Sequence, residues 1–460
     1  MRTGIVIVLY SILLLWSVYS LTKQYNKNKI INASILFQLA FIIYYVLLPI
    51  MSFIVIEFYP NDLTGYLSRI NTADTYDIIY ALFYTFVAYF VIFLVYRIRF
   101  TTEQPILKGK VRVINNTNSP AEFDKKNRRA FRIAFNLGLI TLIIGIIGEL
   151  TVANSLGGIL NAVTMGDKLR AFGNDMSMYL PQSKLFTVTL MVSSLSSTYL
   201  FVYALRIYKK FSVLFLLLLS IMASIFYLMI NAGRLGILLF LITFFADFAI
   251  RKLRHPFIFM LVFSVIGIFM LGVLDDLFFY LSYGHVKESS TSISSILNEF
   301  AFPYLNILNV HHINEWYGLR WGVDYITWII NVIPSSILST FGLSKVTTGY
   351  QFITEYYSGE NAIGGTPTDI LTLGIRQFGF FGVVIVSIII TICCKFFDKL
   401  LDKVHSMDYY FMTLRIALIM FIIVPYADLD SFIRNRYDMI LILVFLVIIS
   451  KFKKRKLLKG

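Results

Sequence analysis

The amino-acid sequence predicts an all-α protein that crosses a membrane about eleven times. Of its 460 residues, 58% are hydrophobic and 16% are aromatic, and the mean hydropathy is +0.74. This apolar fraction lies well above the roughly one half that is usual in water-soluble domains. The apolar residues also gather in runs of about 17 to 25, which is the length of a helix that spans a bilayer. The fold class is therefore that of a polytopic membrane protein.

Hydropathy predicts ten to twelve spans, and eleven is the best count. The predicted spans cover residues 4–21, 31–56, 78–96, 131–149, 185–205, 211–230, 235–250, 257–274, 370–394, 410–426 and 432–450. One connector, 275–369, is too long and too polar to be a simple turn between spans. The chain therefore divides into residues 1–274 with eight spans and a polar loop near 97–129, the large loop 275–369, and residues 370–460 with three spans and a basic tail.

The formal charge of +15 is distributed in a way that indicates the orientation. When the connectors alternate between two sides, one side receives about 29 of the 41 Lys and Arg residues and about 7 of the 26 Asp and Glu residues. Cytoplasmic loops are enriched in Lys and Arg, so that side is cytoplasmic and the large loop is external. Topology and anionic lipid headgroups account for the basic excess, and no nucleic-acid partner is expected. The cytoplasmic loops also lack the Gly-x-x-x-x-Gly-Lys pattern of a nucleotide site.

Two arginines are predicted to lie inside the outer edge of the membrane. Arg234 follows the turn Asn231-Ala232-Gly233 between two spans, and Arg376 lies about two turns into the predicted span 370–394. A charged side chain in the bilayer costs free energy unless it has a partner, so each arginine is a functional hypothesis. The alternative for Arg234 is that its long side chain reaches out to a lipid phosphate.

Four more basic residues are candidates for binding an anionic substrate on the outer face. Lys168 and Arg170 follow a pair of glycines in the connector 151–181, and Arg434 and Arg436 fall in the first turns of the last span. The first two are equally well explained as part of a solvated loop. The other two are equally well explained by pairing with neighbouring aspartates.

The large loop supplies the candidates for acid–base chemistry. Glu299, His311 and His312 are potential general bases, and no spacing distinguishes one from another; Arg320 is a further candidate for substrate binding. Adjacent histidines on a helix point about 100° apart and no third ligand is evident, so neither a metal nor another cofactor is expected. The aromatic residues from Trp321 onward fit one face of a helix, and the sequence favours an interfacial belt over platforms for sugar rings.

Three elements resemble the Wzy-type oligosaccharide repeat unit polymerases, which include the O-antigen and capsular polysaccharide polymerases. They are the Asn-Ala-Gly-Arg turn at 231–234, the Tyr317-Gly318 element with its amphipathic stretch to Pro334, and the Gly364-Gly365 segment before a glycine-rich span. The resemblance extends from about residue 137 to the C-terminus.

The resemblance implies a multi-pass glycosyltransferase of the bacterial plasma membrane. Such an enzyme joins undecaprenyl-diphosphate-linked oligosaccharides into capsule, exopolysaccharide or O-antigen at the outer face. The resemblance implies a flippase and a chain-length regulator as partners. It also implies that outer-face arginines bind the diphosphate, which here means Arg234 first and then Arg170 and Arg376.

Physical chemistry is consistent with this expectation. No ATP or sugar nucleotide is present outside the cytoplasm, so the donor must already be activated on a lipid. A diphosphate leaving group needs positive charge, and arginine offers paired donors that stay protonated. A single displacement by an acceptor hydroxyl would invert the anomeric carbon. The alternative is a flippase or transporter of lipid-linked oligosaccharide, which would have charges near the bilayer midplane and broken helices there.

Overall fold

All regular structure in the described part of the chain is helical, which confirms the predicted all-α class. The computed structural model describes residues 2–28, 32–98, 120–166, 190–231, 233–253, 256–285, 293–331, 333, 335–359, 366–403, 421–427 and 441–448. The N-terminal helices are α1 (Arg2–Asn28), α2 (Ala33–Ile42), the π-helical η1 (Ile43–Leu47), α3 (Leu48–Phe58), the 3₁₀ turn η2 (Pro60–Asp62), α4 (Gly65–Asn71) and α5 (Thr75–Arg97).

The remaining helices belong to the middle and C-terminal parts of the chain. They are α6 (Pro120–Ser155), α7 (Ile159–Thr164), α10 (Ser193–Ile207), α11 (Phe211–Ile230), α12 (Arg234–Lys252), α13 (Pro256–Tyr283), α14 (Ile293–Phe300), α15 (Phe302–Tyr317), η5 (Val323–Tyr325), α16 (Thr327–Asn331), α17 (Ser335–Thr340), α18 (Gly349–Ser358), α19 (Ile370–Phe378) and α20 (Phe380–Lys403).

Six of the described helical segments are long and apolar enough to cross a membrane. They are Gly4–Asn26, Ala33–Phe58, Thr75–Arg97, Arg128–Ser155, Phe211–Ile230 and Phe380–Lys399. Helices α10, α12 and α13 coincide with three further predicted spans, whereas most of 410–426 and 432–450 lies outside the described residues. The membrane class is therefore supported, and the count of eleven stays a prediction.

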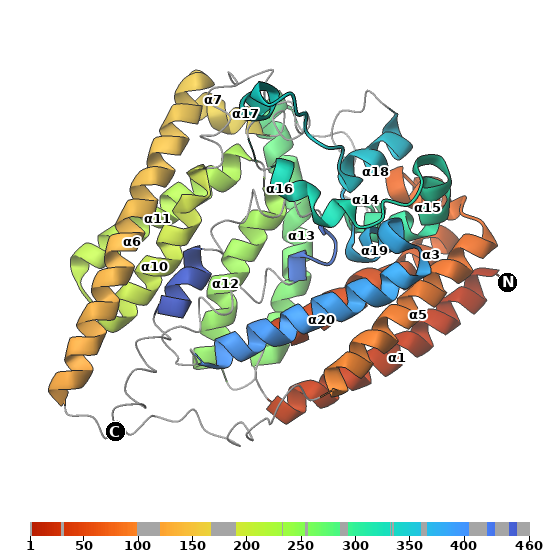
Figure 1. The fold of residues 1–460 in the computed structure, drawn as a ribbon, viewed down its shortest axis with the longest axis horizontal. Helices are drawn as coiled ribbons and strands as arrows, with labels where there is room; N and C mark the ends of the chain where they lie inside the picture. The colour runs from red at the N-terminus through yellow and green to blue at the C-terminus, as the bar shows by residue number, and fades with distance from the viewer. Residues whose placement is uncertain are drawn as a thin grey trace.

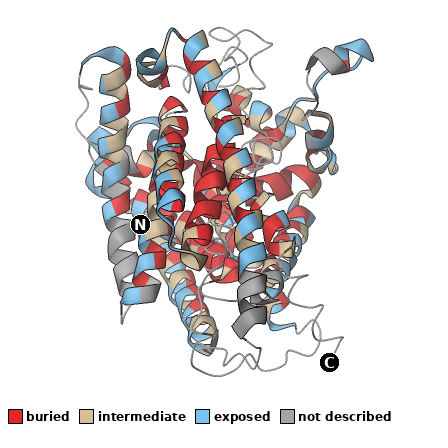
Figure 2. Cartoon of the chain, turned by 90° about the vertical axis from the view of Figure 1, so that its left-hand side faces the viewer, coloured by how far each residue is buried: buried red, intermediate tan, exposed pale blue. Residues whose placement is uncertain are grey.

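The helices pack in neighbouring groups (Figure 1). Helix α5 packs against α1 and against α20, which lies about 300 positions later in the sequence; α6 packs against α10 and α11, and α12 packs against α13. Figure 2 shows that the buried residues gather in the middle of the bundle and that the outer helices expose one side. This pattern is expected of helices that turn a lipid-compatible face outward.

The predicted span 370–394 is wrong in one respect, because the chain breaks in it. Helix α19 ends at Phe378, Gly379 adopts a φ of 58°, and α20 begins at Phe380. The two helices then touch through glycines: a Cβ on Gly382 would lie 1.8 Å from the carbonyl oxygen of Gly374. Arg376 therefore belongs to the short helix α19, and not to the span that starts after the break.

The N-terminus of α19 is fixed in the core by a buried aspartate. Asp369 accepts hydrogen bonds from the backbone nitrogens of Leu371 and Thr372, at 3.1 Å each, and so caps the helix. Its Oδ1 also accepts a bond of 2.5 Å from the hydroxyl of Tyr45. Tyr45 lies in the π turn η1, four residues before Pro49, and Pro49 has no N–H to donate to the carbonyl of Tyr45.

Much of the polar segment 275–369 is built into the helical bundle. Helix α13 continues to Tyr283, and α15 packs against α5 and α19 with most of its first ten residues buried. The ring of Tyr304 on α15 lies 6.0 Å from that of Tyr10 on α1. After α15 the predicted continuous helix over 321–334 is replaced by a turn, the 3₁₀ element η5 and the five-residue α16.

Candidate functional site

The C-terminal half of α15 separates two groups of polar side chains. Successive residues of an α-helix are rotated by about 100°, so residues 311, 312 and 315 share one face and residues 313, 314 and 317 share the opposite one. The first face carries imidazoles and a carboxylate. The second face contacts the arginine-bearing helix α19.

Arg376 is the most unusual side chain on the second face. It is fully buried, with 0% of its surface exposed. Its Nη1 donates to the carbonyl of Ile313 at 3.1 Å and to Oδ1 of Asn314 at 3.2 Å. Its Nε and Nη2 have no hydrogen-bond partner among the described residues. Burial lowers the pKa of Arg376 to about 10, so the guanidinium still carries its charge at pH 7.

Arg320 lies close to Arg376, as two contacts show. The backbone nitrogen of Arg320 donates to the carbonyl of Arg376 at 2.9 Å. The two guanidinium carbons also lie near the same ring, 4.6 Å (Arg320) and 5.6 Å (Arg376) from the centre of Phe352. Cations are attracted to aromatic faces, and at this distance the ring favours both charges.

One carboxylate serves this arginine group. Asp324 accepts from Nε of Arg320 at 2.6 Å and from Nε2 of Gln377 at 2.6 Å. Arg320 also donates from Nη2 to the carbonyl of Thr347 at 2.7 Å. Two guanidinium groups and one carboxylate leave this group of described residues with one net positive charge. The arrangement is suited to an anion that accepts several hydrogen bonds.

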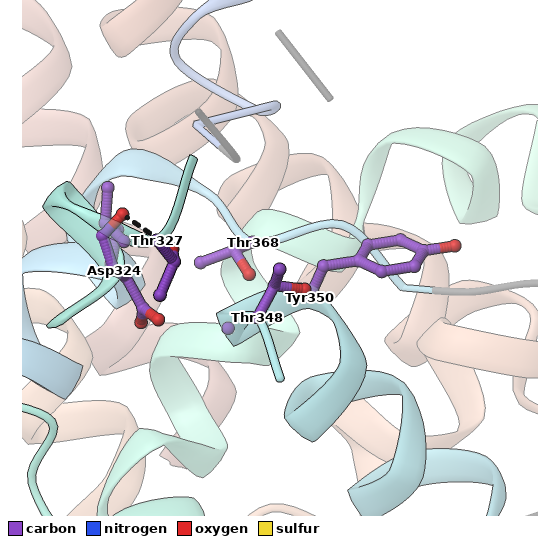
Figure 3. A pocket seen from close by; sticks show the side chains of 7 residues that line it. Asp324, Thr327, Thr348, Tyr350 and Thr368 are labelled. Atoms are coloured by element: carbon purple, nitrogen blue, oxygen red, sulfur yellow. Dashed lines mark hydrogen bonds between the residues drawn. The ribbon is translucent and has the colours of Figure 1, made fainter. Parts of the chain in front are cut away.

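A small pocket adjoins the arginine group (Figure 3). It is lined by Asp324, Thr327, Thr348, Gly349, Tyr350, Thr368 and Leu373, and its free volume of about 10 Å³ is the space of about one water molecule. The hydroxyl of Thr368 has no partner among the described residues. This pocket is too small for a sugar.

The first face of α15 holds an acid–base group. His312 lies between two carboxylates, with Nε2 3.4 Å from Oδ2 of Asp77 and Nδ1 3.6 Å from Oε2 of Glu315. The side chain of His312 is 44% exposed, so a substrate can reach it. Nε2 of His311 lies 2.9 Å from the hydroxyl of Tyr84, and burial lowers the pKa of His311.

Helix α18 connects the two groups. Phe352 contacts the arginines, and Tyr356, one helical turn later, packs edge-on against Trp316 with ring centres 6.2 Å apart. Burial raises the pKa of Tyr356, and the nearby charges of Asp77 and Glu315 raise it further. One turn of helix rises about 5.4 Å, so Phe352 and Tyr356 are about that far apart along α18.

Arg234 belongs to a different part of the fold. It is the first residue of α12, and its Nη1 donates to Oδ1 of Asp275 on α13. The sequence predicts a turn before Arg234, and the structure contains one. It is closed by a 2.9 Å hydrogen bond from the nitrogen of Gly233 to the carbonyl of Leu228. The ion pair gives Arg234 the partner that a charge at the membrane edge requires. Its contact with a substrate stays a prediction.

Several predicted residues lie outside the described part of the chain. They are Lys168, Arg170, Arg434 and Arg436, together with the glycine pair at 364–365. Glu299 lies on α14, and its side chain is likewise outside the description. Of the predicted candidates, the structure therefore brings together Arg320 with Arg376, and His311 with His312.

Several residues of the site were missed from the sequence, and Asp324 is one of them. Asp77 lies in the first turn of α5, a common place for an acidic residue, and Phe352 and Gln377 have no local signal at all. They matter only because the fold brings α5, α18 and α19 around α15. No protein-family model, curated protein or solved structure matches this chain.

Proposed function

We propose that this protein is an inverting membrane glycosyltransferase that polymerises undecaprenyl-diphosphate-linked oligosaccharide repeat units into a surface polysaccharide. The reaction takes place at the outer face of the bacterial plasma membrane. The observation that supports the proposal best is Arg376, a buried guanidinium with two N–H donor atoms that the described protein does not use. A buried donor without a partner is costly, and a phosphate oxygen removes that cost.

Arg376 and Arg320 act on the leaving group. As the bond between the anomeric carbon and the diphosphate oxygen breaks, negative charge grows on that oxygen. Guanidinium donors fixed in a partly dehydrated site stabilise this charge without having to reorganise. Removal of one such donor in a comparable site lowers turnover by about 10²- to 10³-fold.

His312 acts on the acceptor. The acceptor hydroxyl forms the new bond to the anomeric carbon and transfers its proton to an imidazole nitrogen of His312, while the lipid diphosphate leaves with the electron pair. Asp77 and Glu315 flank the ring, with carboxylate oxygens 3.4 Å and 3.6 Å from its two nitrogens. General base catalysis by a positioned histidine contributes about 10²- to 10⁴-fold.

The test is Arg376→Lys, which keeps the charge and removes the paired donors. We expect the host cell to lose long polysaccharide chains on a gel while single repeat units still reach the outer face. Arg206→Lys is the matched control, because Arg206 is a partly buried arginine paired with Asp247 between α10 and α12, away from α15 and α19. Long chains of normal length in Arg376→Lys cells would contradict the proposal.

A flippase of lipid-linked oligosaccharide is the second candidate. The break at Gly379, with Asp369 and Arg376 buried on the short helix side of it, resembles the discontinuous helices of transporters. In that case the Arg376→Lys cells would accumulate lipid-linked repeat units on the cytoplasmic side. Arg376 is bonded to α15 and lies beside Arg320 of the polar segment, which favours the polymerase.

A further inference from the structure

Trp321 has a backbone conformation that its residue type disfavours. Its φ is 51°, and it is the one residue other than glycine with a positive φ in the described part of the chain. For an L-residue with a large side chain this region is sterically strained, whereas glycine adopts it freely. Gly322 follows with a φ of 89°. A glycine at position 321 would make the same turn without strain, so the indole itself is what this position supplies.

The indole contributes little to the packing of the fold. Trp321 is 72% exposed, and the nearest described ring, that of Phe378, lies 6.4 Å away in an edge-on arrangement. A strained residue that buries most of its side chain gains from packing. Trp321 gains little from packing because most of its side chain is exposed. A strained backbone at an exposed side chain points to a role in binding.

The turn is nevertheless rigid and is fixed to the arginine group. The nitrogen of Trp321 donates to the carbonyl of Gln377 at 3.1 Å, next to the bond from Arg320 to the carbonyl of Arg376. The nitrogen of Gly322 donates to Oε1 of Gln377 at 2.9 Å. The backbone that carries the exposed indole is therefore fixed by three hydrogen bonds to the last turn of α19, which also carries Arg376.

We propose that Trp321 is a stacking platform for the sugar ring attached to the diphosphate that Arg320 and Arg376 bind. This inference rests on the proposed function and adds a sugar subsite to it. A pyranose presents an apolar C–H face that covers a flat indole, while its hydroxyls stay in water. In a lipid-linked sugar that ring is bonded directly to the diphosphate, so a platform next to the arginines receives it.

The competing role is an interfacial anchor, which the sequence favoured for this aromatic stretch. An anchor needs an indole at headgroup depth but no particular backbone conformation, so an exposed tryptophan on ordinary helical backbone, as Trp316 is, would meet that need without strain. A role as a stacking platform explains why the turn at Trp321 is strained and fixed by three hydrogen bonds, whereas a role as an interfacial anchor does not.

The test measures sugar binding without turnover. The probe is the oligosaccharide repeat unit released from the host cell's own surface polysaccharide, titrated into the full chain in phospholipid nanodiscs. We expect Trp321→Phe to bind a few-fold more weakly and Trp321→Gly at least about tenfold more weakly than the wild type. Trp16→Phe is the control, because Trp16 on α1 packs against Phe86 and Tyr89 of α5; this variant should bind as the wild type does.

The stability of Trp321→Gly separates binding from folding. Because glycine relieves the strain, this variant should unfold at the same temperature as the wild type or at a higher one. If Trp321→Gly binds the oligosaccharide as tightly as the wild type does, Trp321 is not a stacking platform. The proposal is also wrong if Trp321→Gly binds more weakly and unfolds at a lower temperature than the wild type. Quenching of Trp321 fluorescence by brominated phospholipid but not by the sugar overturns it in favour of the anchor.

The same data distinguish this inference from the proposed function. If Arg376→Lys cells still make long chains but Trp321→Gly loses sugar binding, the polymerase proposal fails and the platform stands. If Arg376→Lys abolishes long chains while Trp321→Gly binds sugar normally, the platform fails alone.

Discussion

Arg376 donates from Nη1 to the main-chain carbonyl of Ile313, 3.1 Å away, and this bond fixes α19 to α15. Ile313 follows His312 directly, so a bond to its carbonyl ties the position of the arginine to that of the histidine on the other face of the helix. The fold achieves this by interrupting an apolar span at Gly379 and packing α19 back onto α20.

The close approach of Gly374 and Gly382 should tolerate no side chain. A Cβ on Gly382 would lie 1.8 Å from the oxygen of Gly374, and backbone atoms cannot move aside as a flexible side chain can. We expect Gly382→Ala to lower the stability by at least about 3 kcal/mol, the upper end of overpacking costs, in thermal unfolding of the protein in nanodiscs. Gly4→Ala, where a Cβ meets nothing within 4 Å, is the control and should be neutral. Equal stability of the two variants would show that α19 and α20 do not touch here.

Asp324 should matter for stability as well as for charge balance. It accepts from Arg320 and from Gln377, and its side chain is 6% exposed. Asp324→Ala leaves a largely buried guanidinium without its carboxylate, which costs about 3–5 kcal/mol in comparable pairs. The unfolding temperature of the variant measures this loss. A variant as stable as the wild type would mean that the Asp324–Arg320 pair is not formed in the membrane.

Substitution of His312 should lower the polymerisation rate far more than substitution of His311. We expect His312→Gln to lower the polymerisation rate by about 10²- to 10⁴-fold with an unchanged unfolding temperature, because the exposed imidazole is the proposed base. His311→Gln is the matched variant one residue away, and its rate should stay within about tenfold of the wild type. The assay is incorporation of labelled repeat units into polymer by purified protein. A larger loss in His311→Gln than in His312→Gln reverses the assignment.

The half-buried His311 should make stability depend on pH. Burial lowers the pKa of His311 below its ordinary value of 6.5, so the unfolded chain binds a proton more readily than the folded one. The contribution of neutral His311 is complete above pH 6.5 and is lost as the pH falls through its lowered pKa. The wild type should therefore lose stability relative to His311→Gln on acidification. The unfolding midpoints of both proteins from pH 8 to pH 4.5 measure this, and a constant difference would contradict it.

The sequence was sufficient for the class of fold and for some of the site. Apolar runs of span length and the Asn231–Arg234 turn predict helices that the structure contains, because helix length and turn residues are local properties. Arg376 could be selected because a charge in an apolar run is conspicuous. The break at Gly379 could not, since apolar residues continue on both sides of Gly379 and glycine is common in spans.

Other features depend on contacts between distant segments. The sequence of α15 reads as polar because of Asn306, His311 and Glu315, yet most of the helix is buried. The pairing of Arg234 with Asp275, 41 positions later, has no signal in either neighbourhood. Arg320 and Arg376 are 56 positions apart and meet only because α19 folds back. Periodicity and spacing describe one segment at a time, so these relationships needed the structure.

The most direct test of the account is the affinity of the full chain for undecaprenyl diphosphate, measured in nanodiscs for the wild type and for Arg376→Met. Methionine fills the buried space and removes both the charge and the unused donors. Hydrogen bonds to charged groups contribute about 1.5–3 kcal/mol each, so we predict that Arg376→Met binds at least about tenfold more weakly, while the Arg206→Lys control keeps the wild-type affinity. The same Kd for Arg376→Met and the wild type would contradict the claim that this guanidinium binds the lipid diphosphate.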